Sequence, residues 1–453
     1  MLRSPGSASP GQGPAEPLRV CPPSQRPSST LGFRLVLAYV FLLPVQVPVG
    51  GGRIGPSDLC LLLLLLLWFP GVRRVPEAWG RWHLALLGCF AMGLTVAFLR
   101  TGDVSLYALV QKTIGILFLL AGYTVLVHHA SSAERIRSML RWFVAGVTAN
   151  AAVAVLVYLG QVTGTFSTEL VNFENARVSG LLIDPNAFGG ILVVALVIHL
   201  WTVGTPSVVW TWRGSTAVSL TLFLALVLTY SRSAWIAFTA AVLAAAALRG
   251  SRGLRALPRS LLGCLVVVVV AGLAYLPDLV ALALRPNQVT GRVEILELAV
   301  ADFIESPLYG IGVGTFGDKH NTNIVHNTAF WFAAEFGLVG LVVFLGLVGW
   351  YVVRLLDTWR REPEPFRSLA FALLLCQIAM LGLAVGVEAF YQRYWWLLFA
   401  VSGGLFSLSR SRRSSPEPRR SEFRIAEASP DRLTPTMALA PGRRRPGSPA
   451  ERQ

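Results

Sequence analysis

The chain is a succession of long apolar stretches separated by short polar segments. A helix needs about 20 mainly apolar residues to cross a bilayer, and twelve candidate stretches occur, at 31–50, 57–70, 82–99, 104–127, 139–161, 183–203, 216–230, 233–248, 260–276, 327–353, 368–387 and 394–409. The pattern predicts an all-α polytopic membrane protein with about 12 transmembrane helices. The second and seventh stretches are the least secure, and the second contains seven consecutive leucines.

The composition supports a membrane protein with polar ends. Of the 453 residues, 54% are hydrophobic and 14% are charged, against roughly a quarter charged in soluble domains. We expect a disordered cytoplasmic leader at 1–30, a transmembrane domain at 31–409 and a disordered basic cytoplasmic tail at 410–453, because both ends are rich in Pro and Ser. A signal peptide is the alternative for the leader, although no clear cleavage motif follows the first apolar stretch.

The basic residues lie unevenly around the predicted spans. When alternate loops are assigned to opposite sides, 29 lysines and arginines fall on the side of the two tails and eight on the other side. Since cytoplasmic loops carry the excess of Lys and Arg, both ends are predicted to be cytoplasmic. The net charge of +15 therefore lies in tails and short loops, and it does not indicate a nucleic-acid partner.

Two segments on the predicted outer side, 162–182 and 277–326, are too long to be simple connections. In the second, the apolar positions recur at helical spacing, at Val293, Leu296, Val300, Phe303 and Ile304. We predict an amphipathic helix at 291–305, lying on the outer membrane surface and ended by Pro307.

Metal and disulfide chemistry are not expected. The five cysteines include no CxxC pair, two acids are nowhere spaced as DxD, and no His/Cys/carboxylate cluster has metal-ligand spacing. We predict no metal and no cofactor.

The candidate general base is His326, which precedes Asn327 at the head of the tenth stretch. A neutral imidazole is well suited to proton transfer near pH 7. The alternative is a surface or capping histidine.

Arg177, Arg232 and Arg292 are all predicted to lie on the outer side. An arginine at membrane depth is costly and tends to have a partner, although it can also extend to lipid headgroups. We place Arg292 at the start of the amphipathic helix, where the helix dipole disfavours a cation, and this conflict hints at a function. Asp184 precedes Pro185, which is good helix-capping chemistry and is explained by structure alone.

Five motifs together resemble the O-antigen ligase and O-antigen polymerase superfamily of bacterial envelopes. They are DPNAFGG (184–190), LTYSRSAW (228–235), Gly291-Arg292, SPLYGIGVGTF (306–316) and HNTAFWFAAEFGLVG (326–340). The resemblance covers roughly residues 170–345 in detail.

This resemblance implies a metal-independent, inverting membrane glycosyltransferase of the bacterial inner membrane with its active site facing the periplasm. The donor would be a glycan on undecaprenyl diphosphate. A ligase would pass it to lipid A-core, and a polymerase would pass it to another lipid-linked glycan. By the same resemblance, Arg232 and Arg292 would hold the diphosphate and His326 would lie beside the acceptor hydroxyl.

The resemblance also makes Arg177, Asp184 and Asn327 lesser candidates for substrate binding. Two other classes of function remain open: a transporter of lipid-linked glycan, and a structural partner of a polysaccharide export complex. A transporter favours polar groups in the middle of the bilayer, where Gln111 and Lys112 are the clear candidates.

Overall fold

A computed structural model describes residues 30–49, 52–68, 79–165, 177–203, 205, 212–250, 286–321 and 325–414. The chain divides into two units, Met1–Arg410 and Ser411–Gln453. Of the second unit, only Ser411–Ser414 are described, at the end of a helix that begins in the first unit. The expected leader and most of the expected tail therefore lie outside the described residues.

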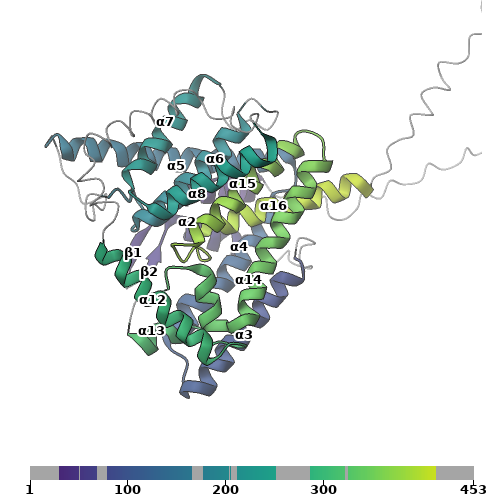
Figure 1. The fold of residues 1–453 in the computed structure, drawn as a ribbon. Coiled ribbons are helices and arrows are strands. Elements are labelled where there is room, and N and C mark those ends of the chain that lie inside the picture. Colours follow the sequence, from purple (N-terminus) through teal and green to yellow (C-terminus); the bar gives the residue numbers. More distant parts are fainter. Residues whose placement is uncertain are drawn as a thin grey trace, which may run out of the picture. The chain divides into compact units, whose positions relative to one another are not determined.

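The described residues form helices and one short hairpin (Figure 1). The helices are α1 (Thr30–Leu42), α2 (Pro56–Trp68), α3 (Arg81–Thr101), the π-helix η3 (Tyr107–Ile114), α4 (Gly115–His129), α5 (Ala133–Val162), α6 (Pro185–Thr202), α7 (Trp212–Leu228), α8 (Arg232–Arg249), α12 (Pro286–Glu305), α13 (Thr315–His320), α14 (Thr328–Arg361), α15 (Phe366–Ala384) and α16 (Arg393–Ser414). In the hairpin, β1 (Val47–Val49) pairs antiparallel with β2 (Gly52–Ile54).

The predicted helical class is confirmed, whereas the number of membrane crossings stays a prediction. Within the described ranges, seven helical segments are long and apolar enough to cross a membrane: α3, η3 with α4, α5, α6, α8, α14 and α15. The first, second and seventh predicted stretches form shorter apolar helices, and the last lies in α16. The ninth, 260–276, falls outside the described residues.

Helix α6 is the most enclosed of the candidate spans, with 94% of its apolar window buried inside the protein. It packs against α5, α7, α8 and α15, and α15 also packs against α8 and α14. The helix is apolar on every face, which suits a position surrounded by other helices. Asp184 caps its first turn by accepting a hydrogen bond from the Asn186 amide at 2.8 Å, and Pro185 occupies the first helical position.

Helix α14 is broken at Gly337, where φ is +66° and ψ is −157°. A break at membrane depth frees backbone groups that need new partners. The preceding loop supplies them, since Ile311 N donates to Ala334 O at 2.9 Å and Leu338 N donates to Pro307 O at 2.8 Å. The glycine-rich turn thus packs into the break in the helix.

The predicted start of the amphipathic helix is wrong. The amphipathic helix begins at Pro286 rather than at 291, because proline suits a first helical turn. Arg292 consequently lies well inside the helix, and the expected conflict with the helix dipole does not arise. Helix α16 continues to Ser414, past the expected start of the tail at 410, and its last turn carries Arg412 and Arg413, which the dipole favours.

The apolar face predicted for α12 is only partly covered by protein. Val293, Val300 and Ile304 are exposed, whereas Ala299 and Asp302 are buried, and α12 packs against α14. An uncovered apolar stripe on such a helix fits contact with lipid. The outer location of this loop stays a prediction.

Candidate active site

Four of the predicted site residues come together, although they lie far apart in the sequence. Arg292 on α12 interacts electrostatically with Arg232 at the start of α8 and with Asp184 at the start of α6. His326, just before α14, interacts with Arg292 and with Asp184. The structure therefore brings two arginines, a carboxylate and an imidazole into one region.

Helix starts build this region. Asn327 caps α14, because its Oδ1 accepts hydrogen bonds from the amides of Ala329 at 3.0 Å and Phe330 at 3.2 Å. Ser231 caps α8 in the same way, accepting from Ala234 N. The N-terminus of each helix carries a partial positive charge, which acts together with the charges of the two guanidinium groups. Such a combination favours an anionic group.

Arg177 joins the DPN motif (184–186) to the SRS motif (231–233). Its Nε donates to Thr229 O at 2.9 Å, and its Nη2 donates to Asn186 Oδ1 at 2.7 Å. The same Asn186 oxygen accepts from the Ser231 hydroxyl at 3.0 Å. Arg177, a predicted substrate-binding residue, thus has partners within the protein and holds the starts of α6 and α8 together.

His326 has the properties of a neutral base. Its side chain is exposed, but partial desolvation, followed by the positive charge of Arg292, lowers its pKa, while Asp184 and Glu388 act in the opposite direction. A lowered pKa leaves the imidazole neutral at pH 7, which is the form that can accept a proton. Desolvation and then the charge of Arg232 also lower the pKa of Arg292, which is the effect expected of two guanidinium groups held close together.

The pairing of Glu335 and Glu388, the two acids near this region, could not be predicted from the sequence. Glu388 forms an ion pair with Lys112, and Glu335 accepts a hydrogen bond from the Gly314 amide at 2.9 Å. The one feature of the sequence that indicated a buried ion pair was the isolated charge of Lys112 within an apolar stretch.

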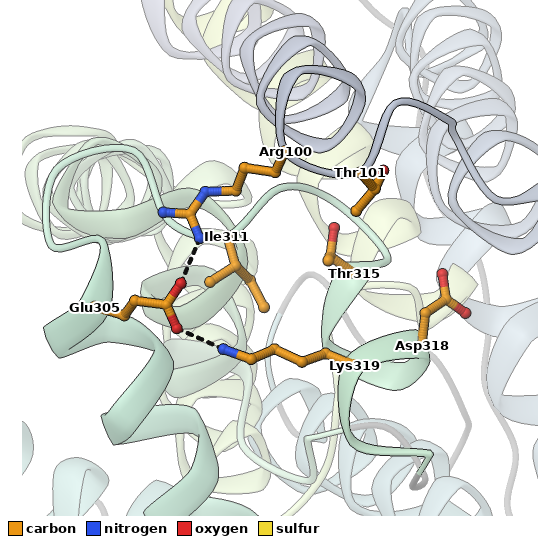
Figure 2. A pocket seen from close by; sticks show the side chains of 7 residues that line it. All are labelled: Arg100, Thr101, Glu305, Ile311, Thr315, Asp318 and Lys319. Carbon is orange, nitrogen blue, oxygen red and sulfur yellow. Dashed lines mark hydrogen bonds and ion pairs between the residues drawn. The ribbon is translucent and has the colours of Figure 1, made fainter.

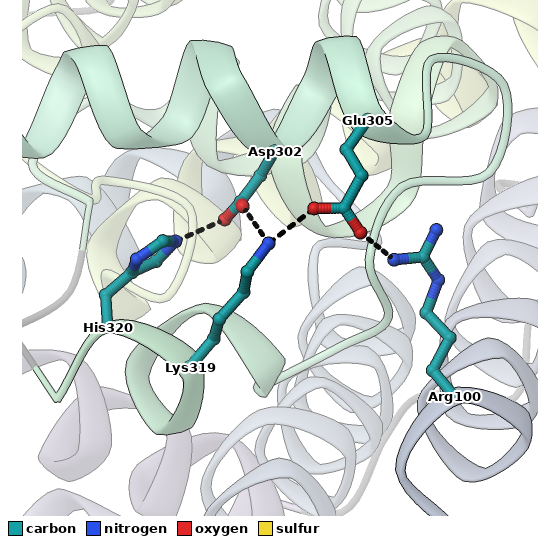
Figure 3. Close-up of polar contacts among 5 residues, drawn as sticks. All are labelled: Arg100, Asp302, Glu305, Lys319 and His320. Carbon is teal, nitrogen blue, oxygen red and sulfur yellow. Dashed lines mark hydrogen bonds and ion pairs between the residues drawn. The ribbon is translucent and has the colours of Figure 1, made fainter.

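A second polar cluster, formed by Arg100, Asp302, Glu305, Lys319 and His320, connects α12, α13 and the end of α3. Figure 3 shows Lys319 on α13 between Asp302 and Glu305 on α12, at 2.7 and 2.5 Å, while Arg100 on α3 reaches Glu305 at 2.7 Å. His320 also contacts Asp302, at 2.8 Å. These contacts hold α12, α13 and the end of α3 together.

The cluster borders an open pocket of about 350 Å³ (Figure 2). It is lined by Arg100, Thr101, Glu305, Ile311, Thr315, Asp318 and Lys319. None of the four converging residues lines this pocket, so it is separate from the candidate site. Among the described residues, no three His, Cys, Asp or Glu side chains are grouped so that they could hold a metal ion.

Comparison with known proteins agrees with the motifs. The family model described as O-antigen ligase matches residues 217–345, a segment that contains Arg232, Arg292 and His326. No curated protein matches the chain. The resemblance of this chain to the O-antigen ligase and O-antigen polymerase superfamily, a family of glycosyltransferase-like membrane enzymes, is thereby confirmed.

Proposed function

We propose that this protein transfers a glycan from undecaprenyl diphosphate to an acceptor sugar at the periplasmic face of the bacterial inner membrane, as an O-antigen ligase. The observation that carries the proposal is the meeting of Arg232, Arg292 and His326, which come from three separate motifs. Arginine suits a diphosphate because its planar group grips two oxygens and stays charged.

The proposed reaction is one displacement at the anomeric carbon. The acceptor oxygen attacks that carbon, and its proton passes to a ring nitrogen of His326. The bond from the anomeric carbon to the diphosphate oxygen breaks, and the electron pair leaves with undecaprenyl diphosphate. The two arginines stabilise this charge, in the role that a metal ion has in other glycosyltransferases. A single displacement inverts the anomeric configuration.

The test uses the full chain in nanodiscs with undecaprenyl diphosphate that carries a fluorescently labelled oligosaccharide. Donor binding and single-turnover transfer are measured separately. We expect His326→Ala to retain donor binding while transfer falls by about 10²–10⁴-fold, as is typical when a general base is lost. Arg232→Lys and Arg292→Lys keep the charge but lose the planar fork, so both should weaken donor binding.

Two acceptors separate the ligase from the polymerase. Product on added lipid A-core supports a ligase, whereas longer lipid-linked chains without it support a polymerase. Arg100→Lys is the control, because Arg100 pairs with Glu305 in the second polar cluster, which is separate from the candidate site. Parental transfer by all three site variants would contradict the proposal and favour a transporter or a structural partner of an export complex.

A further inference from the structure

The segment that links α15 to α16 is anchored to the HNT turn (326–328). The Thr328 hydroxyl donates to Val387 O at 3.0 Å and accepts from Ala389 N at 2.9 Å. Asn327 Nδ2 donates to Val385 O at 3.0 Å. Glu388 therefore lies between two residues that are both bonded to Thr328. Thr328 itself is two positions after His326 in the chain.

The same segment and the first turn of α16 lie against the other two motifs. A Cβ atom on Gly386 would come within 2.1 Å of the Ser233 hydroxyl, next to Arg232. Tyr394, in the first turn of α16, donates its hydroxyl to Ala187 O at 3.4 Å, directly after the DPN motif. The linking segment and this turn lie beyond residue 345, where the family match ends, and together they contact all three motifs.

Glu388 is fixed by a buried lysine. Its partner Lys112 is 4% exposed. The Lys112 ammonium lies 4.5 Å from the ring centre of Trp331 and 4.9 Å from that of Tyr391, and the Tyr391 hydroxyl donates to Lys112 O at 2.9 Å. Burying both charges is costly and contributes little net stability. Such a pair is therefore better explained by a need for position than by a need for stability.

The charged groups around His326 shift its pKa in opposite directions. The charged groups that act on it are Arg292 on α12, Asp184 at the start of α6 and Glu388 in the linking segment. Arg232 acts in turn on Arg292, and Lys112 and Glu388 both act on Glu335. When His326 accepts a proton, the new cation is repelled by Arg292. A carboxylate held nearby offsets that repulsion.

We propose that Lys112 and Glu388 are a positioning pair for His326. Lys112 holds the Glu388 carboxylate in place, and this carboxylate stabilises the imidazolium that forms when His326 takes the proton of the acceptor hydroxyl. The inference rests on the proposed function, and it adds two positioning residues that lie outside the matched segment.

The first measurement follows the reaction of His326 with diethyl pyrocarbonate against pH, by mass spectrometry of the full chain in nanodiscs. Only the neutral imidazole reacts, so the rate rises with pH through the pKa of His326. Glu388 raises that pKa. Glu388→Gln should therefore move the midpoint to lower pH, by about half a unit to one unit for one nearby charge. Single-turnover transfer should fall by about threefold to tenfold, since half a pKa unit corresponds to a factor of about three and one unit to a factor of ten.

Further variants separate position from folding. Lys112→Met leaves a buried carboxylate without its cation, so it should lower both thermal stability and transfer. In Lys112→Met/Glu388→Gln, the pair is neutral, so stability should recover relative to Lys112→Met while the pH midpoint stays low. Arg393→Gln is the matched control, because it breaks the ion pair with Asp58 at 2.7 Å just beyond the linking segment and should leave the midpoint unchanged.

Unchanged midpoints in Glu388→Gln and in the double variant would overturn the proposal, as would the same shift in Arg393→Gln. If His326→Ala retains full transfer, the proposed function of His326 and this inference fail together. If His326→Ala abolishes transfer while the Glu388→Gln midpoint is parental, only the positioning pair is wrong.

Discussion

Arg177 shows that a conspicuous charge in a candidate site can act through its neighbours. It is 7% exposed and donates hydrogen bonds to Thr229 O and Asn186 Oδ1. The residues next to Arg177 in the sequence do not predict these partners. Because it links two motifs that start separate helices, its loss should loosen the region around Arg232 without removing either of the arginines proposed to bind the diphosphate.

Arg177→Lys is expected to destabilise the protein. A lysine has one ammonium group and cannot supply both hydrogen bonds, and losing a bond from a charged donor costs about 2 kcal/mol. The thermal unfolding midpoint in detergent should fall clearly. Arg361→Lys is the control, since that side chain is 70% exposed and should keep the parental midpoint. A parental midpoint in Arg177→Lys would show that the two contacts are not stabilising.

At the residue scale, sequence could predict the candidate groups but not all of their partners. His326, Arg232, Arg292 and Asp184 could be chosen because motifs mark them. The pairing of Lys112 with Glu388 joins residues 276 positions apart. Periodicity reports only which face of a helix is apolar and contains no information on contacts between distant helices.

At the element scale, the apolar stretches were predictable because lipid requires long runs of apolar residues, and the described ones are helical. The break in α14 was not predictable in the same way. Gly337 lies in a mainly apolar run, and its backbone conformation is set by the loop at Pro307–Gly310 that packs against it.

Gly337→Ala should disrupt that break. The φ of +66° with ψ of −157° suits glycine alone, and a Cβ atom would lie 2.4 Å from the Leu308 carbonyl carbon. The strain alone costs about 1–3 kcal/mol. We expect a lower thermal midpoint and faster amide exchange at 307–314. Gly349→Ala lies in the same helix with no atom within 4 Å of its Cβ, so it should be neutral. Equal effects of both changes would argue against a specific fit.

The second polar cluster, around Lys319 and Glu305, should hold α13 in place at neutral pH. Lys319 and then Arg100 lower the pKa of Glu305. The contribution of Glu305 to stability is therefore lost as pH falls through that lowered value. Asp302 and Glu305 raise the pKa of Lys319, so its contribution is lost as pH rises through that raised value. Both contributions are present between the ordinary pKa values of glutamate and lysine, about 4.3 and 10.4.

Lys319→Met removes two of these ion pairs. Amide exchange of α13 at pH 7 should become several-fold faster, measured by deuterium uptake and mass spectrometry. Arg361→Met breaks the exposed pair with Asp357 at 2.6 Å and should leave α13 unchanged, because exposed pairs contribute little. Parental exchange in Lys319→Met would show that packing alone holds α13.

At the scale of the whole molecule, the charge distribution predicts that 277–326 faces the periplasm. Helix α14 has 34 residues, enough at about 1.5 Å per residue to cross a core of about 30 Å. Asp318→Cys should therefore react with an impermeant maleimide in intact spheroplasts, and Arg361→Cys only after permeabilisation. Both are made in a background without the five native cysteines. The reverse pattern would invert the topology.

The enclosure of α6 has a consequence for biogenesis. Its covering helices are made at different times, since α5 precedes it, α7 and α8 follow, and α15 comes much later. When α6 leaves the translocon, lipid must therefore occupy the surface that α15 later covers. Docking of α15 displaces that lipid and completes the scaffold on which the starts of α6 and α8 are held. The protein can accordingly become competent only after α15 has been made, and a ribosome that stalls before α15 leaves an inserted but incomplete bundle.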